Sequence, residues 1–265
     1  MDFTLKIYRS LLESLQRSQY EFITFEEYIK GKQQNNLPGK FVILRHDVDD
    51  LANNSLDFSR IQAEFGVRGT FYFRMISQSY NETIIKEMLT YGHEVGYHYE
   101  TMDTSQGKVD EAYQEFLKHL ETFRGLCEVK TISMHGSPLS KFDNRDIWRK
   151  YSYKDLGIIG EPYFDFEFNE VYYITDTGRA WDGDKYNIRD KAPVENPLTN
   201  TDFIARKYHS TSDIIRAIGD GTYPERVMMN FHPERWTDRT GLWMKQYVKQ
   251  TLKNQVKRLL LALRS

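Results

Sequence analysis

Apolar residues recur along the chain with two spacings, one typical of helices and the other of strands. Apolar positions three or four residues apart predict helices. These lie within 1–40 and at 53–65, 108–124, 143–150, 212–218 and 241–263. A further helix begins after Asn81, a residue that caps helices well, and ends at Gly92. Short runs rich in β-branched and aromatic residues predict strands at 41–46, 69–75, 94–98, 129–134, 156–161, 171–176 and 226–232.

Strands and helices succeed one another from residue 41 onward. Such alternation is typical of a parallel sheet, because a helix returns the chain to the start of the next strand. Seven strands in succession favour a closed or nearly closed α/β barrel over a doubly wound sheet. We expect this barrel over 41–240, a helical cap over 1–40 and a helix packed on the barrel over 241–265. The stretch 177–208 has no clean period, and loops this long are uncommon unless they are functional.

Composition narrows the class of protein. The 265 residues carry a formal charge of −2, which gives no indication of nucleic-acid binding. The single cysteine, Cys127, excludes an internal disulfide and fits a reducing compartment. The chain has no run of 18 apolar residues and no apolar signal-peptide core at its start, so the expected location is the cytoplasm.

Acidic residues end the first strong apolar run. Asp47 and Asp49 are two residues apart, so in a strand they point to the same side. Buried carboxylates are costly unless they are paired or bound to a metal. Two convergent carboxylates suit a site in which one holds a cation and the other accepts a proton. An acidic turn that caps the next helix is the simpler interpretation, and it stays open.

Histidines gather at the same ends of the predicted strands. Four of the seven histidines lie there, namely His46, His98, His135 and His232. In α/β barrels the reactive groups come from the C-terminal ends of strands, where the loops converge. Histidine and carboxylate are the ligands of catalytic zinc and related cations. The pattern therefore predicts a site at this rim.

Three motifs carry a family resemblance over about 41–235. They are His46-Asp47-Val48-Asp49-Asp50, Gly92-His93-Glu94-Val95-Gly96-Tyr97-His98 and Asn230-Phe231-His232-Pro233. With them the chain resembles the polysaccharide deacetylase superfamily, carbohydrate esterase family 4, with the NodB-homology fold. The resemblance implies a distorted (β/α)7 barrel with a divalent metal at the C-terminal rim. Zinc is the first expectation for the metal, and cobalt, manganese, iron and nickel are alternatives.

The resemblance also implies roles for single residues. Asp47 would be the general base, Asp49 and His98 metal ligands, and His232 the general acid. An acid paired with His232 would fix its tautomer, and Asp176 is our candidate.

One position departs from the family pattern. The second metal histidine, four residues after the first, is here Met102, and a thioether is a poor ligand for such cations. His135 from the neighbouring strand could replace it, as could Glu100 or Asp103.

Planar and hydrogen-bonding side chains near the rim suit a sugar, which has an apolar face and a polar edge. We expect substrate contacts from Arg74, Glu100, Trp148, Glu161, Arg179 and Trp181. Helix capping by Asp143 and packing by the tryptophans is the structural alternative.

The terminal helix carries lysines at every fourth position. These are Lys245, Lys249, Lys253 and Lys257, and no acid lies between Gly241 and Ser265. Such a face could contact an anionic membrane or a lipid-linked substrate, although a basic side facing solvent is the ordinary interpretation.

The sequence thus predicts a metal-dependent hydrolase that cleaves a non-peptide carbon–nitrogen bond and removes an N-acetyl group from a sugar. Its expected partner is an N-acetylated sugar, a nucleotide-sugar or a lipid-linked glycan precursor. Two alternatives stay open: a barrel that binds carbohydrate with reduced or no catalysis, and a metal-dependent amidase acting on a non-sugar substrate.

Overall fold

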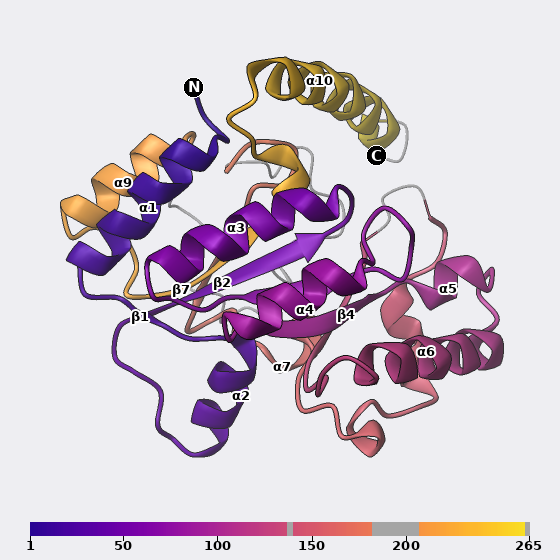
Figure 1. The fold of residues 1–265 in the computed structure, drawn as a ribbon. Coiled ribbons are helices and arrows are strands. Elements are labelled where there is room, and N and C mark those ends of the chain that lie inside the picture. Colours follow the sequence, from indigo (N-terminus) through magenta and orange to yellow (C-terminus); the bar gives the residue numbers. More distant parts are fainter. Residues whose placement is uncertain (137–139, 182–206, 263–265) are drawn as a thin grey trace.

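The centre of the protein is a parallel sheet that curls into a half-barrel surrounded by helices (Figure 1). The computed structural model describes residues 1–136, 140–181 and 207–262, with side chains described to residue 255. The strand order is β5-β4-β3-β2-β7-β6, and β1 pairs with the start of β2. The strands are β1 (Glu21–Phe22), β2 (Phe41–Val48), β3 (Thr70–Phe73), β4 (Glu94–Tyr99), β5 (Ile132–Met134), β6 (Tyr172–Thr175) and β7 (Arg226–Phe231). The predicted α/β class and barrel-like sheet are confirmed.

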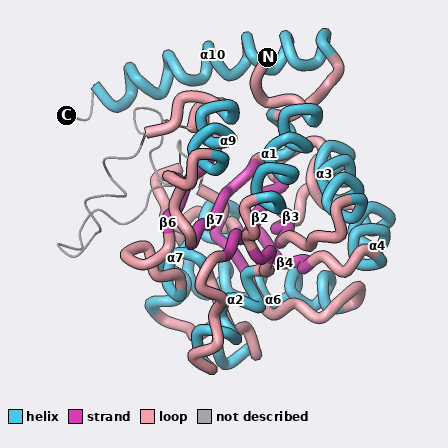
Figure 2. Tube along the Cα trace, turned by 90° about the vertical axis from the view of Figure 1, so that its left-hand side faces the viewer, coloured by secondary structure: helices cyan, strands magenta, loops and turns pink. Residues whose placement is uncertain are grey.

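The helices cover the outside of the sheet and its N-terminal end (Figures 1 and 2). The α-helices are α1 (Leu5–Arg17), α2 (Phe25–Gln33), α3 (Ala52–Glu64), α4 (Glu82–Thr90), α5 (Thr101–Thr104), α6 (Val109–Arg124), α7 (Pro162–Asp165), α9 (Thr211–Gly219) and α10 (Thr240–Ala262). Short 3-10 turns are η1 (Asn144–Arg149), η2 (Lys154–Leu156) and η4 (Pro233–Arg235). Asn81 caps α4 as predicted, because its side chain accepts a hydrogen bond from the N–H of Ile84. No helix in the described part of the chain is long and apolar enough to cross a membrane.

Because side chains alternate along each strand, the two faces of the sheet carry different residues. On β2, Val42 and Leu44 join the large core under the outer helices, whereas Phe41 and Ile43 join a smaller core inside the half-barrel. Successive side chains of a strand point to opposite faces, so Arg45, Asp47 and Asp49 continue the inner series. The inner face therefore carries apolar residues at its start and charged residues at its C-terminal end.

Helix α2 closes the N-terminal end of the half-barrel. Its Phe25, Tyr28 and Ile29 pack in the inner core, and the N–H of Phe25 donates to Thr70, the first residue of β3. The buried carboxylate of Glu94, the first residue of β4, accepts the N–H of Glu26 at 3.0 Å. Because α2 fills the N-terminal end of the half-barrel, a site on the inner face can lie only at the opposite, C-terminal rim.

Two predictions about the elements were wrong. Residues 156–161 form no strand, since the turn η2 ends at Leu156 and only an isolated bridge between Gly160 and Thr131 follows. The seventh strand of the sheet is instead β1, in a segment predicted as helical because Phe22 follows the helical spacing. The path of the sheet ends at β5 and β6, and most of the predicted irregular stretch 177–208 lies outside the described residues.

Candidate active site

Polar side chains from four strands meet at the C-terminal rim of the half-barrel. Asp47 ends the inner series of β2 and Asp49 follows it, while His98 lies on the inner face of β4. His135 follows β5, and His232 follows β7. Since the strands are parallel, their C-terminal ends share one edge, and alternation turns all five side chains toward the same interior.

Asp49, His98 and His135 converge on one carboxylate oxygen. The Nε2 atom of His98 lies 3.4 Å from Asp49 Oδ1, and Nε2 of His135 lies 3.7 Å from the same atom. This oxygen is buried and accepts no hydrogen bond from any residue that the structure describes. An oxygen in that position loses its hydration without compensation, unless something bound between these groups supplies the missing contact.

Each histidine is held so that its Nε2 faces Asp49. Nδ1 of His98 lies 2.9 Å from the carbonyl of Ser133, so this nitrogen carries the proton and Nε2 is the acceptor. Nδ1 of His135 lies 2.8 Å from Oε2 of Glu100. A backbone carbonyl or a carboxylate on the far ring nitrogen is the usual support of a metal-ligating histidine.

The two residues that hold His135 in place, Glu100 and Arg74, are both charged. Arg74 donates to both oxygens of Glu100, at 3.1 and 2.6 Å. Burial raises the pKa of Glu100, but the hydrogen bonds from His135 and Arg74 outweigh it and lower that pKa to about 2. Glu100 is therefore a carboxylate at neutral pH. Arg74 also donates to the backbone carbonyl of Asp49 at 3.1 Å, which ties this support to the loop of the first acid.

The distances from Asp49 Oδ1 to the two histidines fit a divalent cation. Two atoms that bind one zinc ion tetrahedrally at ~2.1 Å each stand about 3.4 Å apart, close to the 3.4 and 3.7 Å seen from Asp49 Oδ1. One carboxylate and two neutral imidazoles are also an ordinary donor set for zinc and its neighbours. Asp49, His98 and His135 could therefore hold such an ion.

A neighbouring set of residues is also close together but has fewer lone pairs to offer. Ligand atoms of Glu100, Asp103 and His135 all lie within 4.8 Å of one another, the one such set among the residues that the structure describes. However, Arg74 already donates to both oxygens of Glu100, and two other side chains donate to the oxygens of Asp103. These lone pairs are engaged, whereas Asp49 Oδ1 is not, so the set that contains Asp49 is the better cation site.

Asp47 is held beside this set by an arginine of its own strand. The Nε and Nη2 atoms of Arg45 donate to the two oxygens of Asp47 at 2.9 and 2.8 Å, and Asn230 donates to Oδ2 at 3.0 Å. Burial raises the pKa of Asp47, but the charge of Arg45, followed by those of His98 and His232, lowers it below its usual value. Asp47 is thus a carboxylate at neutral pH, 3.9 Å from Nε2 of His98.

His232 and Asp176 form a buried ion pair on the other side of the rim. Nδ1 of His232 lies 2.7 Å from Asp176 Oδ1, and the second oxygen accepts the indole N–H of Trp236 at 2.6 Å. Burial and the nearby Arg235 lower the pKa of His232, but Asp176 outweighs both and raises that pKa to about 9. His232 is therefore an imidazolium at neutral pH, with the proton on Nε2 available to an acceptor.

The fourth rim histidine lies on the opposite face. His46 is fully buried in the outer core, stacked on Phe71 at 4.1 Å between ring centroids. Its Nδ1 lies 3.0 Å from the carbonyl of Thr70, and Gln62 contacts its Nε2. Burial lowers its pKa to about 3, so it is neutral. The prediction of four histidines at the rim was therefore wrong for His46. Its side chain points to the outer face, because it lies between Arg45 and Asp47 in the strand and theirs point to the inner face.

Two of the expected substrate contacts are buried supports instead. Glu161 is 0% exposed and accepts the N–H groups of Met134 and Tyr163 at 3.0 and 2.6 Å. Burial raises its pKa to about 7. Its bond to Met134 fixes the end of β5 just before His135. Trp181 is 5% exposed and donates its indole N–H to Thr211 at 2.9 Å, so its ring is packed in the core, and its contact with substrate stays a prediction.

The other expected substrate contacts also have protein partners. Arg74 and Glu100 pair with each other, as described above. Trp148 donates its indole N–H to the hydroxyl of Tyr99 at 2.9 Å. Arg179 lies over the ring of Trp243, 4.7 Å from its centroid. Of these, Arg74 and Glu100 lie beside His135 and are the ones that the structure brings to the site.

Sequence reasoning missed the residues that hold the two catalytic candidates. Arg45 and Asn230 both bond to Asp47, and they stand opposite each other in the pairing of β2 with β7. Arg45 is two residues before Asp47, and Asn230 is two residues before His232, so strand alternation would have revealed both. Trp236 and Arg235, which hold Asp176, follow the last motif closely but carried no signal of their own.

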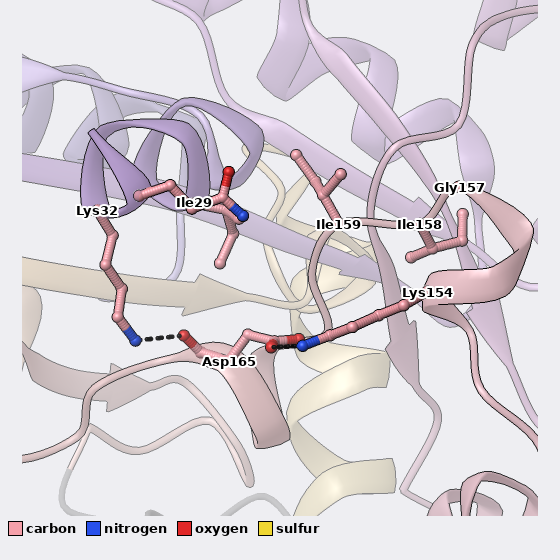
Figure 3. A pocket seen from close by; sticks show the side chains of 8 residues that line it. Ile29, Lys32, Lys154, Gly157, Ile158, Ile159 and Asp165 are labelled. Carbon is pink, nitrogen blue, oxygen red and sulfur yellow. Dashed lines mark hydrogen bonds and ion pairs between the residues drawn. The ribbon is translucent and has the colours of Figure 1, made fainter.

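A separate hollow lies at the other end of the half-barrel. It measures about 410 Å³, and Figure 3 shows Lys32 and Lys154 reaching Asp165 across it. Its lining comes from α2, the turn η2 and α7, namely Ile29, Lys32, Gln33, Lys154, Gly157, Ile158, Ile159 and Asp165. It contains none of the rim residues, so it is not part of the candidate active site.

Comparison with known proteins gives distant structural matches. No family model and no curated protein sequence matches the chain. The Streptococcus pyogenes deacetylase PplD, solved with acetate, is 18% identical over 56% of this chain and 70% of its own, with a TM-score of 0.46. IcaB from Ammonifex degensii is 18% identical over 55% and 71%, with a TM-score of 0.41. A CE4 family pseudoenzyme from Bacillus anthracis is 15% identical over 83% and 66%, with a TM-score of 0.43. The last of these belongs to carbohydrate esterase family 4, which the sequence motifs resemble.

Proposed function

We propose that this protein is a metal-dependent hydrolase that removes an N-acetyl group from a sugar. The observation that carries the proposal is the unsatisfied buried oxygen of Asp49, faced by the Nε2 atoms of His98 and His135. Beside it stand a carboxylate, Asp47, and an imidazolium, His232, which are suited to accept and to donate a proton. A cation site flanked by a base and an acid is an arrangement that can hydrolyse an amide.

Asp49, His98 and His135 would hold the divalent cation, with zinc as the first expectation. Such an ion polarises an acyl oxygen and makes water more acidic when it is bound. His135 would take the place of the histidine that Met102 replaces; Met102 itself is 3% exposed and lies in the outer core. The carboxylate of Glu100 behind His135 raises the basicity of that ring and fixes its orientation.

Asp47 would accept the proton of the attacking water. Its Oδ1 accepts one hydrogen bond, from Nε of Arg45, whereas Oδ2 accepts two. Oδ1 therefore keeps a lone pair for the transferred proton. The three donors also hold the carboxylate in one orientation, which keeps the base aligned with the amide carbon.

His232 would supply the second proton transfer. Its Nδ1 is fixed by Asp176, so the proton on Nε2 is the one presented to the leaving amine nitrogen. The amine must leave protonated, because an amide anion is a very poor leaving group. The N-acetyl group of a sugar, a nucleotide-sugar or a lipid-linked glycan precursor is the substrate class that we propose.

One observation favours a second function, that of a carbohydrate-binding barrel without turnover. Both oxygens of Asp47 are bonded to Arg45, and this ion pair is 1% and 4% exposed in its two side chains. A carboxylate paired so closely is a weakened base. In that case the cation and the rim would bind an acetylated sugar without cleaving it.

Acetate release separates the two functions. Purified protein with added zinc, cobalt or manganese is incubated with a panel of N-acetylated sugars, and acetate is measured. For the amidase alternative it is incubated with small cyclic amides, and opening of the ring is measured instead. The hydrolase proposal predicts acetate from a sugar, and a loss of at least 100-fold with Asp47→Asn. Asp57→Asn, on the outer helix α3, is the matched control and should retain activity. Sugar binding by calorimetry, with neither acetate release nor ring opening from any substrate, would replace the proposal with the binding barrel.

A further inference from the structure

The last helix carries an apolar stripe that faces away from the protein. Helix α10 lies along one edge of the molecule, outside the layers around the sheet (Figures 1 and 2). Met244, Val248 and Leu252 are 52%, 51% and 59% exposed, and Tyr247 beside them is 49% exposed. Residues four apart on a helix are neighbours, so Met244, Val248 and Leu252 form a continuous line. We call these three residues the outer stripe.

The opposite side of α10 is seated on the protein. The indole N–H of Trp243 donates to the carbonyl of Asp2 at 2.8 Å, and the guanidinium of Arg179 lies over the ring of Trp243. Three turns further along the helix, Asn254 donates to the carbonyl of Gly178 at 2.9 Å. These contacts fix which face of the helix is turned outward, so the exposure of the outer stripe is a consequence of how the helix is held.

Positive charge runs beside the outer stripe. Lys245, Lys249 and Lys253 each follow a stripe residue by one position, so they form a parallel row on its flank, and all three are exposed. None of them forms an ion pair with a residue that the structure describes, and the sequence from Gly241 to Ser265 contains no acid. Like charges four residues apart weaken a helix by a few tenths of a kcal/mol, so this row has an intrinsic cost.

We propose that α10 lies on the surface of an anionic lipid bilayer, with the outer stripe in the headgroup region and the three lysines on the phosphates. A flat surface suits a straight apolar line, and the lysines can extend their stems over the apolar edge and leave their charges at the interface. An aromatic residue such as Tyr247, at the border of the stripe, is also typical of that depth. An acidic bilayer matches both parts of the helix face at once, the apolar line and the uniform charge.

The residues that contact the inner side of α10 are close in sequence to the rim of the sheet. Gly178 and Arg179, which hold the helix, follow Asp176 by two and three residues. A bilayer bound to the outer stripe would therefore lie on the side of the protein that carries the His232–Asp176 pair. Binding to lipid does not depend on catalysis, so this inference stands or falls separately from the proposed hydrolase activity.

Vesicle sedimentation tests the inference on the full chain. The probes are vesicles of pure phosphatidylcholine and vesicles with about 30% phosphatidylglycerol, at low and at high salt. Each lysine near an anionic surface is worth roughly a fivefold change in partitioning. The triple variant Lys245→Gln, Lys249→Gln, Lys253→Gln should therefore lose about 100-fold in binding to anionic vesicles, as should the wild type at high salt.

Two matched controls test whether vesicle binding depends on α10 and not on net charge or on exposed apolar residues in general. Lys86→Gln, Lys118→Gln, Lys154→Gln makes the same change in net charge on other surfaces and should bind as the wild type does. Met244→Ser, Val248→Ser, Leu252→Ser removes the outer stripe and should bind at least tenfold more weakly, whereas Phe164→Ser, another exposed apolar residue, should not.

Three results would overturn the inference. The first is equal binding to neutral and anionic vesicles, and the second is anionic binding that survives both triple variants of α10. The third is a wild type that binds no vesicles and forms a dimer that the outer-stripe variant dissociates, since the occupant of the stripe would then be a second copy of this chain. All variants lie at exposed positions, and circular dichroism would show that they stay folded.

Discussion

Replacing Asp176 by asparagine should change the titration of His232 more than any other single substitution. Asp176 is fully buried and accepts four kinds of donor: the His232 ring, the His232 backbone N–H, Arg235 and Trp236. Asparagine keeps the shape but removes the negative charge. The remaining neighbour, Arg235, lowers the pKa of His232, as does burial, so without Asp176 that pKa should fall to 6.5 or below.

The size of the effect follows from the two pKa values. The pKa of His232 rises from 6.5 to about 9 on folding, which corresponds to about 3 kcal/mol of stability. A raised histidine pKa stabilises the folded state fully below pH 6.5, and this stability is lost as the pH rises through 9. The stability difference between wild type and Asp176→Asn should therefore be larger at pH 6 than at pH 10, by about 3 kcal/mol.

Two measurements on metal-free protein check this prediction. Proton NMR of the histidine rings should give a titration near pH 9 in the wild type that is absent in the variant. Urea denaturation at pH 6 and pH 10 should give the difference in the free energy of unfolding. Asp143→Asn, which changes a half-buried helix cap elsewhere, should leave both unchanged. A His232 pKa above 8 in Asp176→Asn, or a stability difference independent of pH, would refute the reasoning.

Three further substitutions test the neighbouring contacts. Arg45→Met leaves the buried Asp47 without its cation, so the free energy of unfolding at pH 7 should fall by about 3–5 kcal/mol in urea denaturation; a loss below 1 kcal/mol would contradict the pairing. Glu100→Gln removes the carboxylate behind His135 and should weaken zinc affinity about 10- to 100-fold in a chelator competition, with little change in the melting temperature of the metal-free protein. Gly96→Ala adds a methyl group 2.5 Å from a backbone carbonyl and 2.6 Å from a tyrosine ring inside the half-barrel, so it should cost at least about 1–3 kcal/mol or abolish soluble expression.

The sequence predicted the elements best where the pattern was long and repeated. The helix over 108–124 corresponds to α6, and the strand over 41–46 to β2, because burial of one face imposes a period on the residues. The strand expected at 156–161 was wrong, since a short apolar run bounded by glycines also occurs in a packed turn. The two-residue β1 is too short for any period to appear.

The sequence predicted most of the residues that form the candidate site, but not which of them contact one another. Strand alternation puts Asp47, Asp49 and His98 on one face, and the structure places them there. The same rule, applied to His46, would have removed it from the rim. Choosing among His135, Glu100 and Asp103 required the tertiary placement of the end of β5 beside β4, which no local pattern specifies.

The large polar and aromatic residues near the rim were the hardest to interpret. A tryptophan or arginine that binds a sugar and one that packs under a loop have the same composition and the same neighbours in sequence. For Trp181 and Arg179, only folding shows the protein partners, Thr211 and Trp243.

The metal content of the purified protein tests the central proposal most directly. After incubation with zinc and removal of free ion, mass spectrometry should find about one zinc per chain in the wild type and in the control Asp103→Asn. His98→Ala, His135→Ala and Asp49→Asn should each lose it. A wild type that retains no metal would contradict the account, as would zinc that survives His98→Ala but is lost with Asp103→Asn, since the ion would then sit in the set with Glu100.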